Sequence, residues 1–506
     1  MVARVKFPPV LGLVAGAVLG YYGFHFIRNG ISGSGILGLL FFLVLPLCLF
    51  RVLARFPGEF SAASRRRFYV LGEQYMSVFS LGLVLGLGSG GAVPRGLSLG
   101  LPVEDITGIS GVLLDDPRIL SGGRGLGTLS LRGAAGGGGI RSSARGEISV
   151  FFPDETAPRL KEFGRKSLVF VEGSLVSGDA GTLFPGEKNL LFRASAVHIV
   201  QPSPALEQFR TGLRMEIGRR FGAGAWGGLA LALLLGIRDN LDTGLAGLYQ
   251  NAGCSHILAL SGMHLAIISS LIAFCLKKPL GLRAAAIAGA VFIALYVFLV
   301  GSQPSLNRAA LMYFLGTLAI LGALPRRPGS LLGLAFLIQI ILWPGSGLSI
   351  SFILSYLALA GILVVGEALH EIFRGKIPPL VLQPLAASVG AFLATAGVTA
   401  FFFGALRPAG ILAGFIIVPL TSLFMIASMI WLVLDLLFPP LSLLLGQGIS
   451  LLYLLMDLLV SLAARLPGIS VPRPILALGL SLGVSALVVW LGNRFGLLKR
   501  RLPSFV

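Results

Sequence analysis

Two histidines interrupt an apolar segment at residues 254–268, CSHILALSGMHLAII. Titratable side chains are costly inside a membrane, and where they occur they usually mark a functional site. His256 and His264 are separated by about 80° around a helix, so both side chains point roughly the same way. Ser261 and Gly262 lie between them, and Gly is a poor helix former while Ser can bond the backbone. We therefore expect a broken helix whose polar groups face a water-filled cavity.

The same residues admit two other interpretations. Histidine and serine side chains can tie neighbouring membrane helices together through hydrogen bonds. A metal site would use the histidines together with Cys254, although no carboxylate or further thiolate stands at clear ligand spacing. A conduction site, a helix tie and a metal site are all compatible with the spacing alone.

An arginine forms the second candidate site. Arg308 lies a few residues into an apolar segment, with Ser305 and Asn307 just before it. An arginine at the centre of a membrane helix costs about 2.5–3.5 kcal/mol on insertion scales, and snorkelling reduces this cost. The polar start of the helix would favour an anion such as a phosphate. The alternative is an arginine bonded to backbone carbonyls or to Asp435 or Asp457.

The elements that must position these residues are membrane helices. The chain has 506 residues, of which 55% are hydrophobic and only 12% charged, whereas soluble domains carry about 25% charged residues. Apolar runs of bilayer-spanning length predict an α-helical, polytopic protein with about 12 transmembrane helices. Three fall near 8–27, 35–54 and 72–93, and the others near 255–276, 284–301, 305–323, 329–343, 347–366, 382–404, 409–435, 441–463 and 474–492. A shorter run at 225–236 is expected to be re-entrant.

Lysine and arginine predict the orientation, because cytoplasmic loops collect them. A basic loop at Arg65–Arg67 follows the second predicted helix. Further basic turns lie at 277–283, 326–327 and 374–376, and the C-terminal segment is basic as well. All of these fall on one side if the helices alternate. We expect a multi-pass membrane protein with both termini in the cytoplasm. The first run lacks a signal-peptide cleavage pattern and is expected to be retained.

Residues 96–201 differ in kind from the rest of the chain. Short β-rich segments alternate with Gly, Ser, Pro and Asp clusters, which predicts a small β domain outside the membrane. Its charges balance, with eleven basic and eleven acidic residues. The net charge of +19 therefore arises in the membrane part. Residues 205–222 follow, with Leu206, Phe209, Leu213 and Ile217 on one helical face, which predicts an amphipathic helix at the outer interface.

Several arginines lie where orientation alone disfavours them, outside or within the membrane. An arginine there can contact lipid headgroups, or it can belong to a cationic entrance for an anionic cargo. The candidates for such an entrance are Arg210, Arg214, Arg238 and Arg407.

Residues 231–268 resemble the ComEC family of DNA-uptake channel proteins, whose core is G-x-x-H-L-L-A-I-S-G-L-H. The residues that match in register are Gly253, His256, Leu258, Ser261, Gly262 and His264. A second block, YVFLVGSQPSLNRAALM, matches at Gly301, Pro304, Ser305, Arg308 and Ala309. A third, LWPGSGLSISFILSYLALAG, matches at Pro344, Ser351, Phe352, Leu354 and Ser355. The blocks occur in the family's order within residues 205–465.

The chain departs from the family at two points. Gly414 stands where the family usually has Asn. Longer members end in a metallo-β-lactamase-like nuclease domain, whose two metals need an H-x-H-x-D-H cluster. The five histidines of this chain do not form this cluster. We therefore expect a variant of the family that lacks the metallo-β-lactamase-like domain, and we expect no nuclease activity. There is also no Walker motif for a nucleotide, and we expect no cofactor.

The resemblance implies N-terminal transmembrane helices in 1–95, an extracytoplasmic OB-like β domain in 96–201, an interfacial helix in 202–224 and a competence-type channel domain in 225–506. It implies a channel of the bacterial inner (plasma) membrane, not an enzyme, that passes single-stranded DNA into the cytoplasm during natural transformation. The residues expected to contact DNA are His256, Ser261, Gly262, His264, Ser305, Arg308, Ser351 and Ser355. The expected partners are the lipid bilayer, single-stranded DNA, a separate DNA receptor, a nuclease, and a cytoplasmic motor or single-strand-binding protein. The alternatives are a secondary transporter of another anionic solute and an envelope assembly protein that keeps the fold.

Overall fold

The fold is described from a computed structural model of the chain. It covers residues 9–29, 81–82, 84–90, 97–119, 125–137, 140–153, 164–178, 189–222, 225–239, 241, 243–258, 260, 262–472 and 474–494. The predicted helix near 35–54, the basic loop at Arg65–Arg67, the C-terminal basic segment from residue 495 and Ser261 lie outside these residues.

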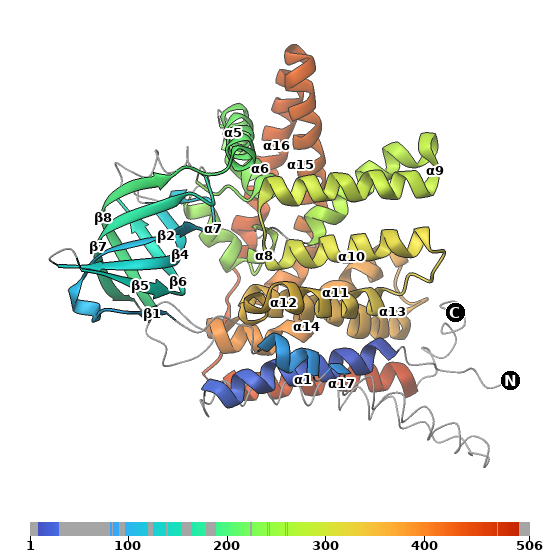
Figure 1. The fold of residues 1–506 in the computed structure, drawn as a ribbon. Helices are drawn as coiled ribbons and strands as arrows, with labels where there is room; N and C mark the ends of the chain where they lie inside the picture. Colours follow the sequence, from blue (N-terminus) through green and yellow to red (C-terminus); the bar gives the residue numbers. More distant parts are fainter. Residues whose placement is uncertain are drawn as a thin grey trace.

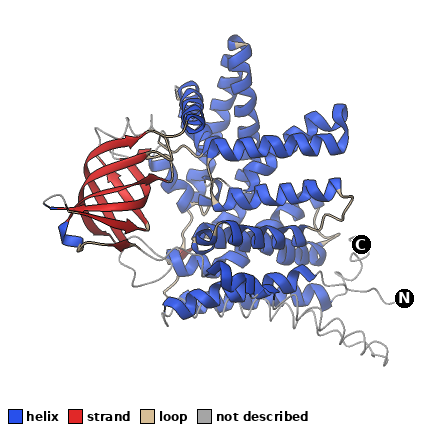
Figure 2. Ribbon diagram, viewed as in Figure 1, coloured by secondary structure: helices blue, strands red, loops and turns tan. Residues whose placement is uncertain are grey.

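The strands form one unit at one side of a larger helical part (Figures 1 and 2). Five strands close a barrel in the order β2, β4, β6, β8, β7 and back to β2. Their bounds are β2 Ile106–Leu113, β4 Gly125–Gly136, β6 Glu147–Phe152, β7 Leu168–Gly178 and β8 Asn189–Gln201. Only the β6–β8 pairing among these five strands is parallel. A closed five-stranded barrel is the architecture expected of an OB-like domain.

Buried and partly exposed residues alternate along the strands, and this pattern explains why the barrel closes. In β6 the buried positions alternate with partly exposed ones, so Ile148, Val150 and Phe152 point inward. They meet Val169 and Val171 of β7 in a core of buried residues. Burial of one face on every strand fixes the pairing register, because a slip by one residue would turn the apolar side chains outward.

Three shorter strands accompany the barrel, and four helices follow it in the chain. The strands are β1 (Ser98–Leu99), β3 (Arg118–Ile119) and β5 (Arg141–Arg145). After the barrel come α5 (Ala205–Phe221), α6 (Ala225–Leu235), α7 (Thr243–Asn251) and α8 (Ser255–Leu258). Leu206, Phe209 and Leu213 of α5 are exposed, whereas Glu207, Arg210 and Thr211 are buried. Three of the four residues of the predicted apolar face thus point away from the protein, whereas Ile217 is half-buried against the main helical core.

The remaining helices make up the membrane part. They are α9 (Gly262–Val300), α10 (Pro304–Leu321), α11 (Pro328–Leu342), α12 (Ile350–Gly361), α13 (Glu367–Phe373), α14 (Pro379–Phe403), α15 (Ala409–Leu437), α16 (Pro439–Ala464), α17 (Pro474–Arg494) and the N-terminal α1 (Pro9–Asn29). Several begin at a proline, whose missing N–H costs nothing in the first turn. A π-helical turn, Ile362–Gly366, joins α12 to α13. In α9, non-helical backbone at Gly281 (φ 76°) divides the 39 residues into two helices.

Five of the described helical segments are long and apolar enough to cross a membrane. They are Gly262–Val300, Ile350–Phe373, Pro379–Phe403, Ala409–Leu437 and Pro439–Ala464. They support a helical membrane protein with a β domain, while the expected number of about 12 spans is not confirmed. In Figure 1, α9 to α12 run across the view away from the barrel, and α15 and α16 stand upright against them.

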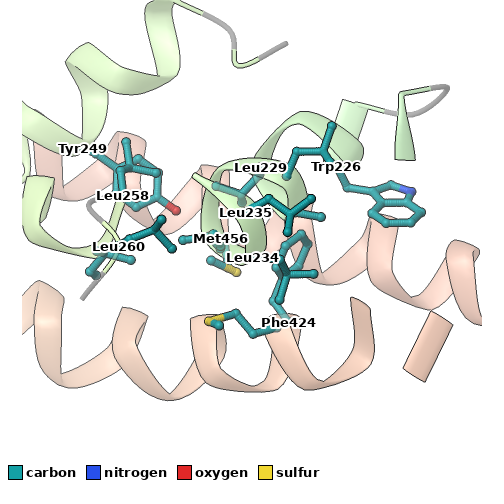
Figure 3. Packing of buried hydrophobic residues seen from close by; sticks show 14 of the residues in the cluster. Trp226, Leu229, Leu234, Leu235, Tyr249, Leu258, Leu260, Phe424 and Met456 are labelled. Atoms are coloured by element: carbon teal, nitrogen blue, oxygen red, sulfur yellow. The ribbon is translucent and has the colours of Figure 1, made fainter. Parts of the chain in front are cut away.

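The short helix α6 lies at the centre of the main core. Every residue from Trp226 to Leu235 is buried. Figure 3 shows Leu234 and Leu235 close to Phe424 of α15 and Met456 of α16. A helix that is apolar all round must be enclosed on all sides. The run that is too short to span the membrane is therefore packed inside the helical part.

Candidate functional site

The predicted helix break is present. α8 ends at Leu258, α9 begins at Gly262, and Leu260 between them is not helical. Arg238 donates from Nη2 to the carbonyl of Leu258 at 2.9 Å. Leu260 is buried, and it lies against Gly236 so closely that a Cβ there would stand 2.5 Å from its Cδ1. The break is thus a fixed feature of the fold, held by side chains from the α6–α7 connection.

Arg308 lies directly against the break. A Cβ on Gly262 would stand 2.7 Å from Nη2 of Arg308, so the guanidinium touches the first residue of α9. The first turn of a helix has backbone N–H groups without intrahelical partners and carries a partial positive charge. Two features that favour an anion therefore converge at this point, the start of α9 and a buried arginine.

The partners of Arg308 are uncharged. Its Nη1 donates to the carbonyl of Ser355, and its guanidinium carbon lies 5.8 Å from the ring centroid of Tyr356. Only 8% of Arg308 is exposed, and its Nε has no hydrogen-bond partner among the described residues. In the described part of the chain no carboxylate pairs with Arg308, and Asp435 pairs instead with Arg220 at 2.7 Å. Of the alternatives raised by the sequence, the bond to a backbone carbonyl is the one observed.

The two histidines differ in their surroundings. His264, in the first turn of α9, is completely buried, whereas His256 on α8 is exposed. Of the two histidines, only His256 has exposed surface in this structure. That both face one polar cavity stays a prediction.

The predicted serines gather between α10 and α12. The hydroxyl oxygens of Ser305 and Ser351 lie 3.2 Å apart and link the two helices. Ser355 contributes its backbone carbonyl to Arg308. Ser305, Arg308 and Ser355 thus lie within one or two helical turns of each other on facing helices, with Gly262 against the same arginine. Sequence blocks separated by tens of residues meet here.

The arginines of α5 lie in a buried ion-pair network. Arg210 is fully buried, donates from Nε to Glu207 at 2.9 Å, and also bonds Asp116 of the barrel. Arg214 pairs with Asp116 at 3.4 Å. These two cations are matched by carboxylates and do not face solvent. In this structure they join the barrel to the helices and do not form an exposed cationic entrance.

Glu207 is the centre of this network. It accepts from Arg165 at 2.8 Å, Lys166 at 2.8 Å and Arg210 at 2.9 Å. Burial alone would raise the pKa of Glu207, but the hydrogen bonds from these cations outweigh it and hold the pKa at about 2. Glu207 is therefore charged throughout the physiological pH range.

All four arginines expected at the entrance share one role. Each donates to a carbonyl in the last turn of a helix, where four carbonyls lack intrahelical partners and the dipole is negative. Arg210 bonds Leu299 of α9, Arg214 bonds Leu235, Leu299 and Val300, Arg238 bonds Leu258, and Arg407 bonds Asn251 at 3.0 Å. Each of the four therefore supplies a hydrogen-bond donor to a helix C-terminus. Arg238 is exposed and Arg407 half-buried, so these two also present charge to solvent.

The sequence profile of one protein family, the competence protein family, matches residues 233–495 of the chain. This match spans just over half of the chain. The chain belongs to the competence protein family.

Two curated relatives are similar to parts of the chain. ComE operon protein 3 of Bacillus subtilis (strain 168) is 28% identical over 167 residues, which cover 32% of this chain and 21% of that protein. An uncharacterized protein of Aquifex aeolicus (strain VF5) is 27% identical over 299 residues, covering 58% of this chain and 69% of that protein. The chain thus matches about a fifth of the length of the B. subtilis relative.

Two residues of this competence protein were not identified from its sequence. The Tyr356 hydroxyl donates to Oε1 of Gln339 at 2.9 Å, and Nε2 of Gln339 donates to the carbonyl of Pro304 at 3.0 Å. Gln339 is fully buried and Tyr356 is 9% exposed. The sequence did contain one indication of this pair, the lone glutamine in the apolar run LAFLIQIILW, because a buried amide needs hydrogen-bond partners.

Proposed function

We propose that this protein is a conduit that passes single-stranded DNA inward across the bacterial plasma membrane during natural transformation. The observation that carries the proposal is Arg308, a buried cation at the start of α9 that no described carboxylate neutralises. A buried charge without an opposite charge is costly. A passing phosphate would supply that opposite charge, and family membership makes DNA the most relevant phosphate polymer.

In this proposal the phosphodiester backbone, not the bases, is recognised. Arginine binds phosphate through its planar fork, and helix N-termini bind it through N–H groups. Both contacts are independent of base sequence, as a transformation channel requires. His256, exposed beside the break, would offer a ring for stacking, while Ser305 and Ser351 would offer hydroxyls. The proposed role is transport, and no catalytic residue is assigned.

The arrangement supports the proposed topology. The last turns of α9 lie against the turn before β7, because the Arg165 guanidinium carbon lies 5.9 Å from the Phe298 ring centroid. Three segments lie on the side of the helical part away from the barrel (Figure 1). They are the turn inside α9, the α10–α11 connection and α13. These turns carry the basic residues expected in the cytoplasm. We therefore place the barrel (96–201) outside, with 1–95 and 225–506 as membrane parts of about 12 spans and 202–224 at the interface. The proposed partners are a DNA receptor, a nuclease, and a motor or single-strand-binding protein.

Replacement of Arg308 by Gln tests the proposal. Arg308→Gln keeps a polar side chain of similar length but removes the charge. We expect normal amounts of protein in the membrane and at least about a tenfold loss of internalised labelled DNA, equivalent to about 1.4 kcal/mol. Arg219→Gln is the matched control, since Arg219 is 78% exposed. Uptake at the control rate in cells that carry Arg308→Gln would refute the proposal.

The same cells distinguish the transporter alternative. If Arg308→Gln leaves DNA uptake intact but alters accumulation of a small anion such as inorganic phosphate, the protein is a solute transporter. Loss of DNA uptake with unchanged phosphate accumulation supports the DNA conduit.

A further inference from the structure

We propose that Tyr356 and Gln339 are positioning residues that hold the Arg308 guanidinium at the start of α9. The inference rests on the proposed role of Arg308 and concerns what makes that role possible. Neither residue needs to touch the cargo.

A continuous set of contacts connects three helices. Gln339 of α11 donates to the carbonyl of Pro304 at 3.0 Å and accepts from the Tyr356 hydroxyl of α12 at 2.9 Å. The ring of Tyr356 then lies under the guanidinium of Arg308, at 5.8 Å. The set begins and ends on α10, at Pro304 and one turn later at Arg308. A shift of α11 or α12 relative to α10 would therefore change where the guanidinium can lie.

The set fixes one orientation of a side chain that otherwise has many. The arginine side chain is long and loses rotamer freedom when it is held in one orientation. A cation over an aromatic face is attracted to the ring, and this attraction fixes the position of the cation only where the ring is held. The ring of Tyr356 is held because its hydroxyl has a single buried acceptor, and that acceptor is itself held by a backbone carbonyl. Both residues are buried, so water does not offer a substitute partner in this arrangement.

Gly262 limits the guanidinium from the other side. A Cβ at this position would stand 2.7 Å from Nη2 of Arg308 and 3.4 Å from Cβ of Ala309. The backbone at Gly262 does not have a positive φ, so the restriction there is one of space. The guanidinium therefore occupies a slot between the Tyr356 ring, the Ser355 carbonyl and the first residue of α9.

Tyr356→Phe is the first variant to test. It keeps the ring and removes the hydroxyl that orients it. We expect about a five- to tenfold decrease in internalised labelled single-stranded DNA per unit of membrane-inserted protein, the size of one lost buried hydrogen bond. Tyr296→Phe is the matched control, because Tyr296 is also buried and donates to a carbonyl, that of Leu234, at 2.7 Å. Its uptake should stay at the unaltered rate.

A double variant separates positioning from a purely structural role. Tyr356→Phe leaves Oε1 of Gln339 unsatisfied, whereas Gln339→Leu leaves the Tyr356 hydroxyl unsatisfied and also removes the bond to the carbonyl of Pro304. The two together remove both members of the Tyr356–Gln339 bond, so the double variant should lose less stability than the sum of the two single variants. A structural role predicts that the double variant recovers both protein amount and DNA uptake. A positioning role predicts that it recovers protein amount while uptake stays low. Recovery of uptake in the double variant would overturn the inference, even if a single variant fails to fold.

Gly262→Ala gives an independent measurement from the opposite side of the slot. It should lower uptake by displacing the guanidinium, whereas Gly316→Ala, on α10 with no atoms within 4 Å of the added methyl group, should not. Equal uptake for the two alanine variants would contradict the inference.

The Arg308→Gln variant, run in the same assay, shows which claim has failed. Loss of uptake in Arg308→Gln with normal uptake in Tyr356→Phe, Gln339→Leu and the double variant would overturn the inference and leave the proposed function standing. Normal uptake in Arg308→Gln would remove the proposed function and the inference together.

Discussion

Two groups of buried arginine differ in how their charge is balanced. Arg210 and Arg214 of α5 face the carboxylates of Glu207 and Asp116. Arg308, in the membrane part, faces a carbonyl, a tyrosine ring and a glycine. Both groups bond helix or loop carbonyls, so hydrogen bonding alone does not distinguish them. Among the described residues, carboxylates pair with the first group and not with Arg308.

The difference in charge balance predicts different roles for the two groups of arginines. A buried cation matched by carboxylates is complete, and its loss leaves an uncompensated anion behind. A buried cation without such a match can gain from an anion that arrives from outside. The α5 arginines therefore act on folding and on the attachment of the barrel, while Arg308 is the better candidate for contact with cargo. The predictions below test that division.

Arg210→Ala should produce the largest effect. It leaves Glu207 buried with fewer partners and removes the bonds to Asp116 and Leu299. Breaking a buried ion pair typically costs about 3–5 kcal/mol. We expect a marked fall in protein amount and in the thermal unfolding midpoint of the purified full-length protein in detergent. An unchanged midpoint would mean that the network does not hold the barrel in place.

Acid should weaken the same network in a defined pH window. The folded pKa of Glu207 is lowered from 4.5 to about 2. A lowered carboxyl pKa gives stability that is fully present above pH 4.5 and is lost as the pH falls towards 2. The contribution is on the order of 3 kcal/mol. The unfolding midpoint should fall more steeply between pH 5 and pH 2 in the unaltered protein than in Glu207→Gln, and parallel curves would contradict this.

Arg308→Lys should affect transport and leave folding unchanged. Lysine keeps the charge but loses the planar fork that binds phosphate in two places. We expect normal protein amount and a drop in DNA uptake of roughly tenfold, or about 1.4 kcal/mol. Arg210→Lys is the comparison, and it should reduce protein amount. If the two substitutions change protein amount and DNA uptake in the same way, the division between the two groups of arginines is wrong.

Arg219→Ala should have the smallest effect. Arg219 belongs to α5 but pairs with Glu216 at the surface, with 78% of its side chain exposed. Exposed ion pairs contribute about 0–1 kcal/mol. The unfolding midpoint and DNA uptake should both stay close to those of the unaltered protein. A large fall in the unfolding midpoint or in DNA uptake would contradict the division. It would show that the location of an arginine on α5, and not its burial beside carboxylates, determines the effect of replacing it.

The local patterns of the sequence predicted much of the fold. β-rich segments between turn residues predicted a small β domain, the apolar face of α5 predicted the exposure of Leu206, Phe209 and Leu213, and Ser261-Gly262 predicted the break before α9. Each of these follows from a repeat or a backbone preference within a few residues. The membrane class followed from composition.

The partners of the arginines were not predictable in the same way. The carbonyl that Arg407 bonds is that of Asn251, 156 residues away along the chain, and the one that Arg308 bonds is 47 residues away. Backbone carbonyls exist at every position, so no residue type marks them as acceptors. The same holds for Gln339 and Tyr356, whose spacing of 17 residues has no helical meaning until α11 and α12 lie side by side. The four expected entrance arginines were identified as unusual, but their capping role needed the fold.

The bond from Arg210 to Leu299 has a consequence for biosynthesis. These residues are 89 positions apart, and Asp116 precedes Arg210 by 94. Ribosomes add about 5–20 residues per second, so the end of α9 is made roughly 5–20 s after α5. During that interval Arg210 and Arg214 lack the carbonyls at the end of α9, and only Leu235 of α6 offers Arg214 such a partner. The nascent chain must therefore keep an incompletely bonded group of arginines and carboxylates in solution or at the membrane surface until α9 has been threaded in and its last turn has emerged.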